Sequence, residues 1–226
     1  MSTEDLEVPA GGHRQVRFSA PPEATEILLV RHGETIAADP ERPFPLVDGH
    51  GDPELAPEGV EQAVRVADRL AGSRIDAIYV TTLRRTLETA APLVERTGLV
   101  PIPEPDLREV RLGEWEGGLY RHKVVSLDPV ALEMFERERW DVVPGAESNE
   151  ELARRVRAGI ERISRDQRGG RVVVFSHGGA IGMVLSLATG SRPFAFVAVD
   201  NGSISTIIVT EDKWFLRGYN DVCHLG

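Results

Sequence analysis

Two short apolar segments, far apart in the chain, are each followed by a histidine and a glycine. Residues 26–30 lead into Arg31 and His32, and residues 172–175 lead, after a serine, into His177. Short apolar runs rich in valine and isoleucine are typical of buried strands in a parallel sheet. Ligands bind at the carboxyl ends of such strands, so two parallel neighbours would bring both histidines to one crevice.

The residue types at the first strand end are suited to an anionic ligand. A histidine can act as a nucleophile or a base, and the guanidinium of Arg31 offers a planar fork of donors for phosphate or carboxylate. Gly33 is expected to let the backbone turn sharply and come close to a ligand. One motif of this kind is as compatible with a structural role, that of a capped strand end with a solvated Arg-His pair, as with a functional site. Its recurrence at a second strand end favours a functional site.

Strand-like and helix-like patterns alternate along the chain. This order predicts a three-layer α/β/α sandwich in which a mostly parallel sheet carries helices on both faces. One helix is expected to begin at Pro57, and another to run to about Thr97 after a cap at Thr81 or Thr82. The first of them is expected to bury Val60, Ala63, Val64, Ala67 and Leu70.

The C-terminal third carries clear boundary patterns. A capping box at residues 148–151 predicts the start of a further helix. Residues 196–200 and 203–210 are predicted to be strands joined by an Asn-Gly turn, and residues 214–217 a last edge strand.

The chain divides into a tail and one domain. Residues 1–24 are polar and predict a flexible N-terminal tail, whereas residues 25–226 are expected to form a single domain. The proline-rich loop at 37–56 is expected to form one wall of the site, and its Asp-Gly-His-Gly-Asp run is interpreted as a turn. Residues 118–147 are expected to be an inserted lid or rim with one helix at about 129–140. Aromatic and histidine side chains there either line a pocket or form a small core: Trp115, Tyr120, His122 and Trp140.

Composition limits the class of partner. The formal net charge of −10 argues against binding of nucleic acid. Cys223 is the only cysteine, so no disulfide or cysteine metal site is expected, and a reducing compartment fits. No run approaches about 18 apolar residues and the acidic N-terminus is unlike a signal peptide, so no membrane association is expected. The predicted location is the cytoplasm, and the pattern leaves open whether the chain forms a homo-oligomer.

Further charged residues follow other strand ends. Arg84 and Arg85 lie at the start of the second helix, where anions are favoured, although such a pair is commonly a solvated helix face. Arginines and a second histidine can surround a phosphoryl group while a neutral histidine attacks phosphorus and a carboxylic acid protonates the leaving oxygen. Arginines that carry the charge remove the need for magnesium. The candidate set is Arg31, His32, Arg85, Glu109 and His177.

At these residues the chain resembles the histidine phosphatase superfamily, which has the phosphoglycerate mutase-like fold. The resemblance covers roughly residues 26–210 and rests on blocks in the family order. The blocks are Arg31-His32-Gly33, Asp52-Pro53-Glu54-Leu55 with Gly59 and Gln62-Ala63, Thr81 to Ala90, Leu107-Arg108-Glu109 with Gly113, Trp115 and Glu116-Gly117, and Ser176 to Gly179.

The resemblance implies a role for each candidate residue. His32 is the histidine that becomes phosphorylated, and Glu109 is the catalytic acid. Arg31, Arg85 and His177 bind the substrate phosphate, and the match selects Arg85 over Arg84.

The chain also departs from its relatives. Ala37 and Ala38 replace a Trp-Asn pair, which implies that a side chain that helps to hold phosphate is absent. The proline-rich stretch at 40–53 does not resemble the loop of the mutases. Ala56 stands where relatives have a capping Thr or Ser.

The favoured hypothesis is a phosphomonoesterase that acts on a small phosphorylated metabolite through a phosphohistidine, without metal or cofactor. A first alternative is a cofactor-dependent phosphoglycerate mutase, which returns the phosphoryl group to the substrate. A second is a protein that binds a phosphorylated ligand with little turnover. A zinc hydrolase with His32, His177 and Glu109 as ligands ranks lower, because Arg31 and Arg85 would oppose a second cation.

Overall fold

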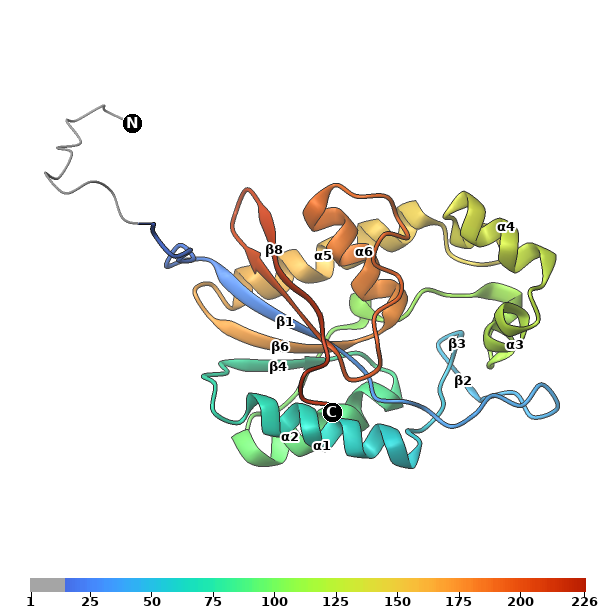
Figure 1. Ribbon diagram of the computed structural model, residues 1–226, viewed down its shortest axis with the longest axis horizontal. Helices are drawn as coiled ribbons and strands as arrows, with labels where there is room; N and C mark the ends of the chain where they lie inside the picture. Colours follow the sequence, from blue (N-terminus) through green and yellow to red (C-terminus); the bar gives the residue numbers. More distant parts are fainter. Residues whose placement is uncertain (1–14) are drawn as a thin grey trace, which may run out of the picture.

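A six-stranded sheet forms the centre of the protein, whose computed structural model describes residues 15–226 (Figure 1). Its strand order is β5-β4-β6-β1-β7-β8. The first four strands of this order are parallel, and the last two are antiparallel to their neighbours. The strands are β1 (Thr25–Arg31), β4 (Ala77–Val80), β5 (Ile102–Pro103), β6 (Arg171–Ser176), β7 (Ile204–Val209) and β8 (Trp214–Asp221).

Helices cover both faces of this sheet, which confirms the predicted three-layer α/β/α sandwich with a mostly parallel sheet. Helices α1 (Pro57–Leu70) and α2 (Arg84–Thr97) pack together below the sheet in Figure 1. Helices α5 (Asn149–Asp166) and α6 (Gly178–Thr189) pack together on the opposite face. The predicted capping box is present at the start of α5, between Ser148 and Glu151.

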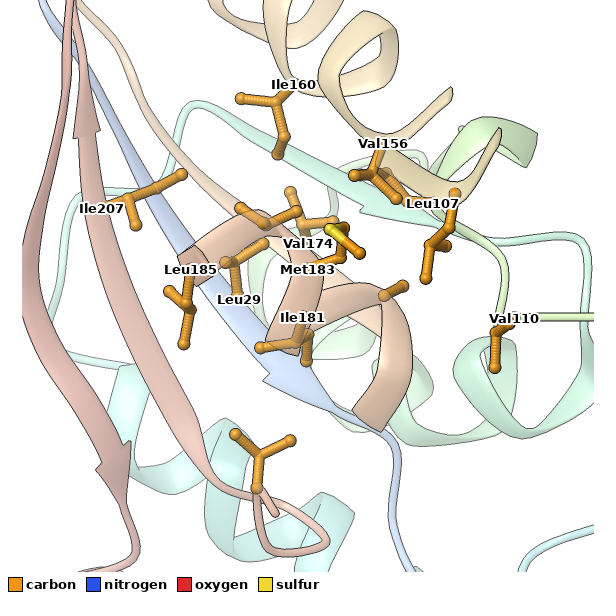
Figure 2. Packing of buried hydrophobic residues seen from close by; sticks show 14 of the residues in the cluster. Leu29, Leu107, Val110, Val156, Ile160, Val174, Ile181, Met183, Leu185 and Ile207 are labelled. Carbon is orange, nitrogen blue, oxygen red and sulfur yellow. The ribbon is translucent and has the colours of Figure 1, made fainter. Parts of the chain in front are cut away.

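Strand β1 supplies alternate side chains to two apolar clusters, one on each face of the sheet. Leu28 and Val30 belong to the cluster beneath α1 and α2. Ile27 and Leu29 belong to the larger cluster beneath α5 and α6, part of which Figure 2 shows around Leu29, Val174 and Met183. Complete burial of one such side chain contributes about 1.5–3 kcal/mol, so the position of β1 is strongly fixed.

The register of β1 and β6 brings the two histidine motifs together. These parallel strands pair from Glu26 with Arg171 to Arg31 with Ser176. The pairing continues one residue further, because the amide of His32 donates to the carbonyl of Ser176 at 3.0 Å. Both histidines therefore leave the same edge of the sheet, as the strand pattern predicted.

Two segments surround this edge. The loop after β1 contains a small hairpin, β2 (Leu46–Val47) and β3 (His50–Gly51), so the predicted turn is confirmed at residues 48–49, whereas residues 50–51 belong to a strand. The insertion contains the predicted helix as α4 (Pro129–Arg137), which begins after the N-cap Asp128, and in addition α3 (Leu119–Val125), which was not predicted. Short 3₁₀ turns flank it: η1 (Pro105–Leu107), η2 (Gly113–Trp115) and η3 (Trp140–Val142).

The C-terminal hairpin lies later in the chain than predicted. Residues 196–200 form no strand, because both edges of β7 are occupied by β1 and β8. These residues instead pack over α6, where the backbone of Phe196 approaches Gly182. The predicted edge strand at 214–217 is confirmed as part of the longer β8.

The buried face of α1 is rotated relative to the prediction. Val60 and Val64 are 52% and 40% exposed, whereas Val66 is completely buried. The rotation follows from Gly59, whose Cα hydrogen faces the backbone of Glu34 in the segment that follows β1. Ala56 precedes the helix without a side-chain cap, as predicted.

The N-terminal tail is described only in part. Its residues 1–14 lie outside the described part of the chain, and residues 15–24 contain no helix or strand. Phe18 lies 6.5 Å from Phe215 of β8, measured between ring centroids. Within residues 15–226, no helix is long and apolar enough to cross a membrane.

A substitution at Gly59 tests the close approach of α1 to the end of β1. Gly59→Ala places a methyl group against the Glu34 backbone and should lower the free energy of unfolding by about 1–3 kcal/mol, despite the higher helix propensity of alanine. Urea unfolding measures this change. Gly72→Ala, where nothing lies within 4 Å of the added carbon, is the matched control. Equal effects of the two substitutions would contradict the packing described.

Candidate active site

A cavity of about 220 Å³ opens at the edge of the sheet where β1 and β6 end. Four of the predicted site residues line it: Arg31, His32, Arg85 and Glu109. The fifth, His177, lies behind them and is completely buried. The rest of the wall comes from the loop after β1, the insertion and the start of α6; it includes Phe44, His50, Trp115, Tyr120, Arg121, Trp140 and Gly178.

His32 is held as a neutral imidazole with one nitrogen free. Its Nδ1 lies 2.8 Å from the carbonyl oxygen of Gly33, which can only accept, so Nδ1 carries the proton and Nε2 keeps its lone pair. Burial lowers the pKa of His32 well below its usual value, and the charges of Arg85 and Arg31 lower it further. An unprotonated Nε2 is the state that a nucleophilic histidine requires.

Gly33 lies against α1, and its expected close approach to a ligand stays a prediction. A side chain there would collide with the carbonyl and Cα of Gly59, so this glycine lets β1 and α1 approach each other closely.

Arg31 and Arg85 bring two positive charges to the cavity. Arg31 donates to the carbonyl of Val199, and its buried Nε has no hydrogen-bond partner among the described residues. Arg85 donates through Nη1 to the carbonyl of Gly51 at 2.8 Å. Burial lowers the pKa of both, that of Arg85 to about 10, so both remain cationic at neutral pH. An anion in the cavity would meet both guanidinium groups, beside the carboxylates of Glu109 and Glu116 that line the same cavity.

His177 lies within a buried hydrogen-bond chain, between Arg85 and Thr81. Arg85 donates through Nε to Nδ1 of His177 at 3.2 Å, so Nε2 carries the proton and donates to Oγ1 of Thr81 at 2.9 Å. Thr81 in turn lies 3.0 Å from Oγ1 of Thr86. Burial lowers the pKa of His177 well below its usual value, which is consistent with this neutral form. In this arrangement His177 orients Arg85, and its predicted contact with substrate phosphate stays a prediction.

Thr81 therefore does not cap α2, contrary to the expectation from the sequence. Helix α2 begins at Arg84 after Leu83, and neither Thr81 nor Thr82 caps it. The first amide of the helix, that of Arg84, donates instead to Asp52 at 2.8 Å. A cap from a distant loop leaves no local sequence pattern, which explains the error.

Arg84 and Arg85 have separate positions, as the resemblance implied. Arg85 is 6% exposed and faces the cavity. Arg84 is exposed and pairs with Glu54 and Glu88 on the surface.

Glu109 lines the cavity, and its carboxylate contacts the start of α6. Its carboxylate accepts from the amides of Val110 at 2.9 Å, Ala180 at 3.2 Å and Gly179 at 3.3 Å. The positive end of the α6 dipole lies at the same place. The carboxyl group is thus fixed beside the second histidine motif, within the cavity.

The loop after β1 forms a wall of the cavity, as predicted. His50 is buried, and its Nε2 lies 3.1 Å from the carbonyl oxygen of Glu109. Glu116 accepts from the amide of Gly51 at 2.7 Å and so joins this wall to the insertion. The sequence pattern indicated the wall but not these contacts.

The insertion forms the rim. Trp115 and Trp140 are buried and Tyr120 lies between them, with ring centroids 6.4 Å and 6.2 Å away, so these side chains both line the cavity and form a small core. Burial raises the pKa of Tyr120 to about 12. The guanidinium of Arg121, which the sequence reading missed, donates to Thr35 and to the carbonyl of Ile36. His122 is exposed and does not line the cavity.

The site offers no evident cluster of metal ligands. Among residues 15–226, no three His, Cys, Asp or Glu side chains are grouped so that they could hold a metal ion. The zinc arrangement considered from the sequence, with His32, His177 and Glu109 as ligands, is therefore not formed.

Comparison with known proteins identifies the family. The sequence profile of the histidine phosphatase superfamily (branch 1) matches residues 27–222. The chain belongs to this superfamily, as its motifs implied.

Its relatives include both mutase-like proteins and phosphatases. The chain is 37% identical over 207 residues to phosphoglycerate mutase-like protein 4 of Arabidopsis thaliana, covering 88% of this chain and 86% of the relative. It is 33% identical over 209 residues to the metal-independent phosphoserine phosphatase of the same plant, covering 90% and 84%. A mycobacterial glucosyl-3-phosphoglycerate phosphatase superposes with a TM-score of 0.71 at 28% identity, covering 87% and 99%. The chain is thus similar to phosphatase and mutase-like enzymes.

The two buried neutral histidines should make stability depend on pH. Their pKa values are lower in the folded than in the unfolded chain, so as pH falls through about 6.5 the unfolded chain takes up protons that the folded chain does not. The free energy of unfolding should therefore decrease below that pH. The decrease in the free energy of unfolding from pH 7.5 to pH 5.5 should be smaller in His32→Gln than in the wild type, by on the order of 1 kcal/mol.

Urea unfolding at both pH values measures the effect, and the exposed His122 provides the control substitution, His122→Gln. If wild type and His32→Gln lose the same stability over this range, His32 is not held neutral in the folded protein.

Proposed function

We propose that the protein is a metal-independent phosphomonoesterase that acts on a small phosphorylated metabolite through a phosphohistidine intermediate. The observation that carries this proposal is the free Nε2 of the buried, neutral His32 in a cavity shared with Arg31 and Arg85. A neutral nucleophile beside two fixed cations suits attack on a phosphate dianion, where charge stabilisation and alignment dominate catalysis.

In the first step, Nε2 of His32 attacks phosphorus and the bond to the ester oxygen breaks. Arg31 and Arg85 bind the non-bridging oxygens, and His177 keeps Arg85 in place. Protonated Glu109 gives its proton to the departing oxygen, which leaves as an alcohol. The positive charge formed on the imidazole is offset by the phosphoryl group that it carries.

In the second step, water attacks the phosphohistidine. Glu109, now a carboxylate, takes a proton from the water as the bond between phosphorus and nitrogen breaks. Inorganic phosphate is released and His32 returns to its neutral form. The carbonyl of Gly33 holds Nδ1 throughout, so the same nitrogen, Nε2, is presented in every cycle.

The cavity supports a small substrate. Its volume of about 220 Å³ admits a phosphate and a short organic group beside Trp115, Tyr120 and Trp140. The similarity to the phosphoserine phosphatase and the glucosyl-3-phosphoglycerate phosphatase supports hydrolysis as the outcome.

A phosphoglycerate mutase is the second candidate, because a mutase-like protein is among the relatives at 37% identity. Both reactions need the same phosphohistidine, and they differ in whether water or the bound substrate accepts the phosphoryl group. The proline-rich loop at 40–53, which does not resemble that of the mutases, favours the phosphatase.

Release of inorganic phosphate from a panel of small phosphate esters, in EDTA, tests the proposal. Wild-type protein should turn over at least one ester, and His32→Ala should reduce turnover by about 10³-fold or more because the nucleophile is lost. Arg84→Ala, an exposed arginine outside the cavity, should retain activity.

Isomerisation of 3-phosphoglycerate with a bisphosphoglycerate primer is measured in parallel. Isomerisation without phosphate release would favour the mutase. Binding of vanadate or phosphate without either reaction would favour a ligand-binding protein and contradict the proposal.

A further inference from the structure

Glu109 lies in a segment that lacks regular hydrogen bonding. The 3₁₀ turn η1 ends at Leu107, and η2 begins at Gly113, so residues 108–112 belong to no helix or strand. A side chain on irregular backbone is placed only as accurately as that backbone is held. The contacts that hold this segment therefore determine how accurately the carboxyl group of Glu109 is placed.

The side chain of Arg155, from α5, reaches the backbone on the N-terminal side of Glu109 and Glu109 itself. Its Nη1 donates to the carbonyls of Asp106 at 2.9 Å and Arg108 at 2.7 Å, and its Nη2 donates to that of Glu109 at 2.8 Å. Nε and Nη2 also donate to the two carboxylate oxygens of Glu147, at 2.7 Å and 2.8 Å. Every N–H of the guanidinium is thus used, three of them on the backbone around Glu109.

Glu147 extends this contact to the other side of Glu109. Its carboxylate accepts from the amide of Arg111 at 3.3 Å, and its own amide donates to the carbonyl of Arg111 at 2.8 Å. Both partners are largely shielded from solvent, with side chains 20% (Arg155) and 10% (Glu147) exposed. The pair therefore fixes the backbone on both sides of Glu109.

The position of this ion pair separates it from the substrate. Neither Arg155 nor Glu147 lines the cavity. On the opposite side of the same backbone, the carboxylate of Glu109 contacts the amides of Gly179 and Ala180 in α6. The segment is held between α5 and α6, and the carboxyl group projects into the cavity from that fixed backbone.

We infer that Arg155, locked by Glu147, is a positioning residue that sets the acid Glu109 for proton transfer to the leaving oxygen. This inference rests on the proposed function, because it concerns the acid of that reaction. A displacement of about 1 Å in a catalytic group can cost on the order of 100-fold in rate.

The test uses leaving groups that differ in their need for an acid. Phosphoserine has an alkyl leaving group that requires protonation, whereas p-nitrophenyl phosphate has a stable aryl one. Arg155→Met should lower kcat/KM, which reports the steps up to departure of the leaving group, by roughly 10- to 100-fold for phosphoserine or another alkyl ester that the wild type hydrolyses. It should lower kcat/KM for p-nitrophenyl phosphate only about threefold or less.

Arg162→Met is the matched control. Arg162 lies on the same helix and pairs with Glu104 and Asp106, but it makes no contact with residues 108–111. Its replacement should affect the two esters alike. A loss of equal size on both esters in Arg155→Met would show a purely structural role and overturn the inference.

Further variants separate geometry from charge. Arg155→Lys keeps the charge but cannot bridge three carbonyls and both oxygens of Glu147, so it should retain most of the defect. Full recovery in that variant would overturn the inference. Glu147→Gln gives the same comparison of esters if Arg155→Met does not fold, and a loss confined to the alkyl ester is again expected.

Glu109→Gln distinguishes a failure of the acid role of Glu109 from a failure of the positioning role of Arg155. If this variant shows no preference between the esters, the acid role of Glu109 fails and the positioning inference fails with it, whereas the proposed function fails only if no ester is hydrolysed. If Glu109→Gln shows the preference and Arg155→Met does not, only the positioning inference fails. In the double variant, Arg155→Met should add little to the loss on the alkyl ester.

Hydrogen exchange gives a readout that needs no turnover. The amides of Val110, Gly179 and Ala180 donate to the Glu109 carboxylate and should exchange faster in Arg155→Met than in wild type or Arg162→Met. Unchanged exchange at these amides would overturn the inference even in a protein that hydrolyses none of the esters.

Discussion

The parallel pairing of β1 with β6 is the constraint on which the site depends. Its register places Arg31 beside Ser176, and the amide of His32 continues the ladder to the Ser176 carbonyl. A slip by one residue would turn the alternating side chains of β1 to the wrong cluster, so the apolar cores fix the register. Those cores therefore also fix the two histidine rings, whose centroids lie 5.1 Å apart.

The electrostatics of the site follow from burial beside cations. His32 and His177 are neutral because a protonated imidazole would lose its hydration next to the charge of Arg85. Arg31 and Arg85 line the same cavity and can bind an anion there. In our account, the features that would destabilise the protein in acid are those that leave Nε2 of His32 free to attack.

Much of the fold and most of the site residues could be predicted, because their patterns are local. The strands before His32 and His177 are apolar runs, and the capping box before α5 is contained in residues 148–151. Errors arose where distant segments decide the outcome. Thr81 forms a hydrogen bond with His177, and Asp52 caps α2 in its place. The contact of Gly59 with the backbone of Glu34 turns Val60 outward. The contribution of Arg155 was equally hidden, because its partners are carbonyl groups that any sequence would supply.

The central claim is that His32 carries the phosphoryl group during turnover. Rapid quenching of the wild-type protein with an ester that it hydrolyses, followed by mass spectrometry of its peptides, tests this claim directly. Our account predicts a phosphoryl group on the peptide that contains His32, sensitive to acid and absent from His32→Ala. Steady turnover with no phosphorylated peptide, or with the group on the His177 peptide, would contradict it.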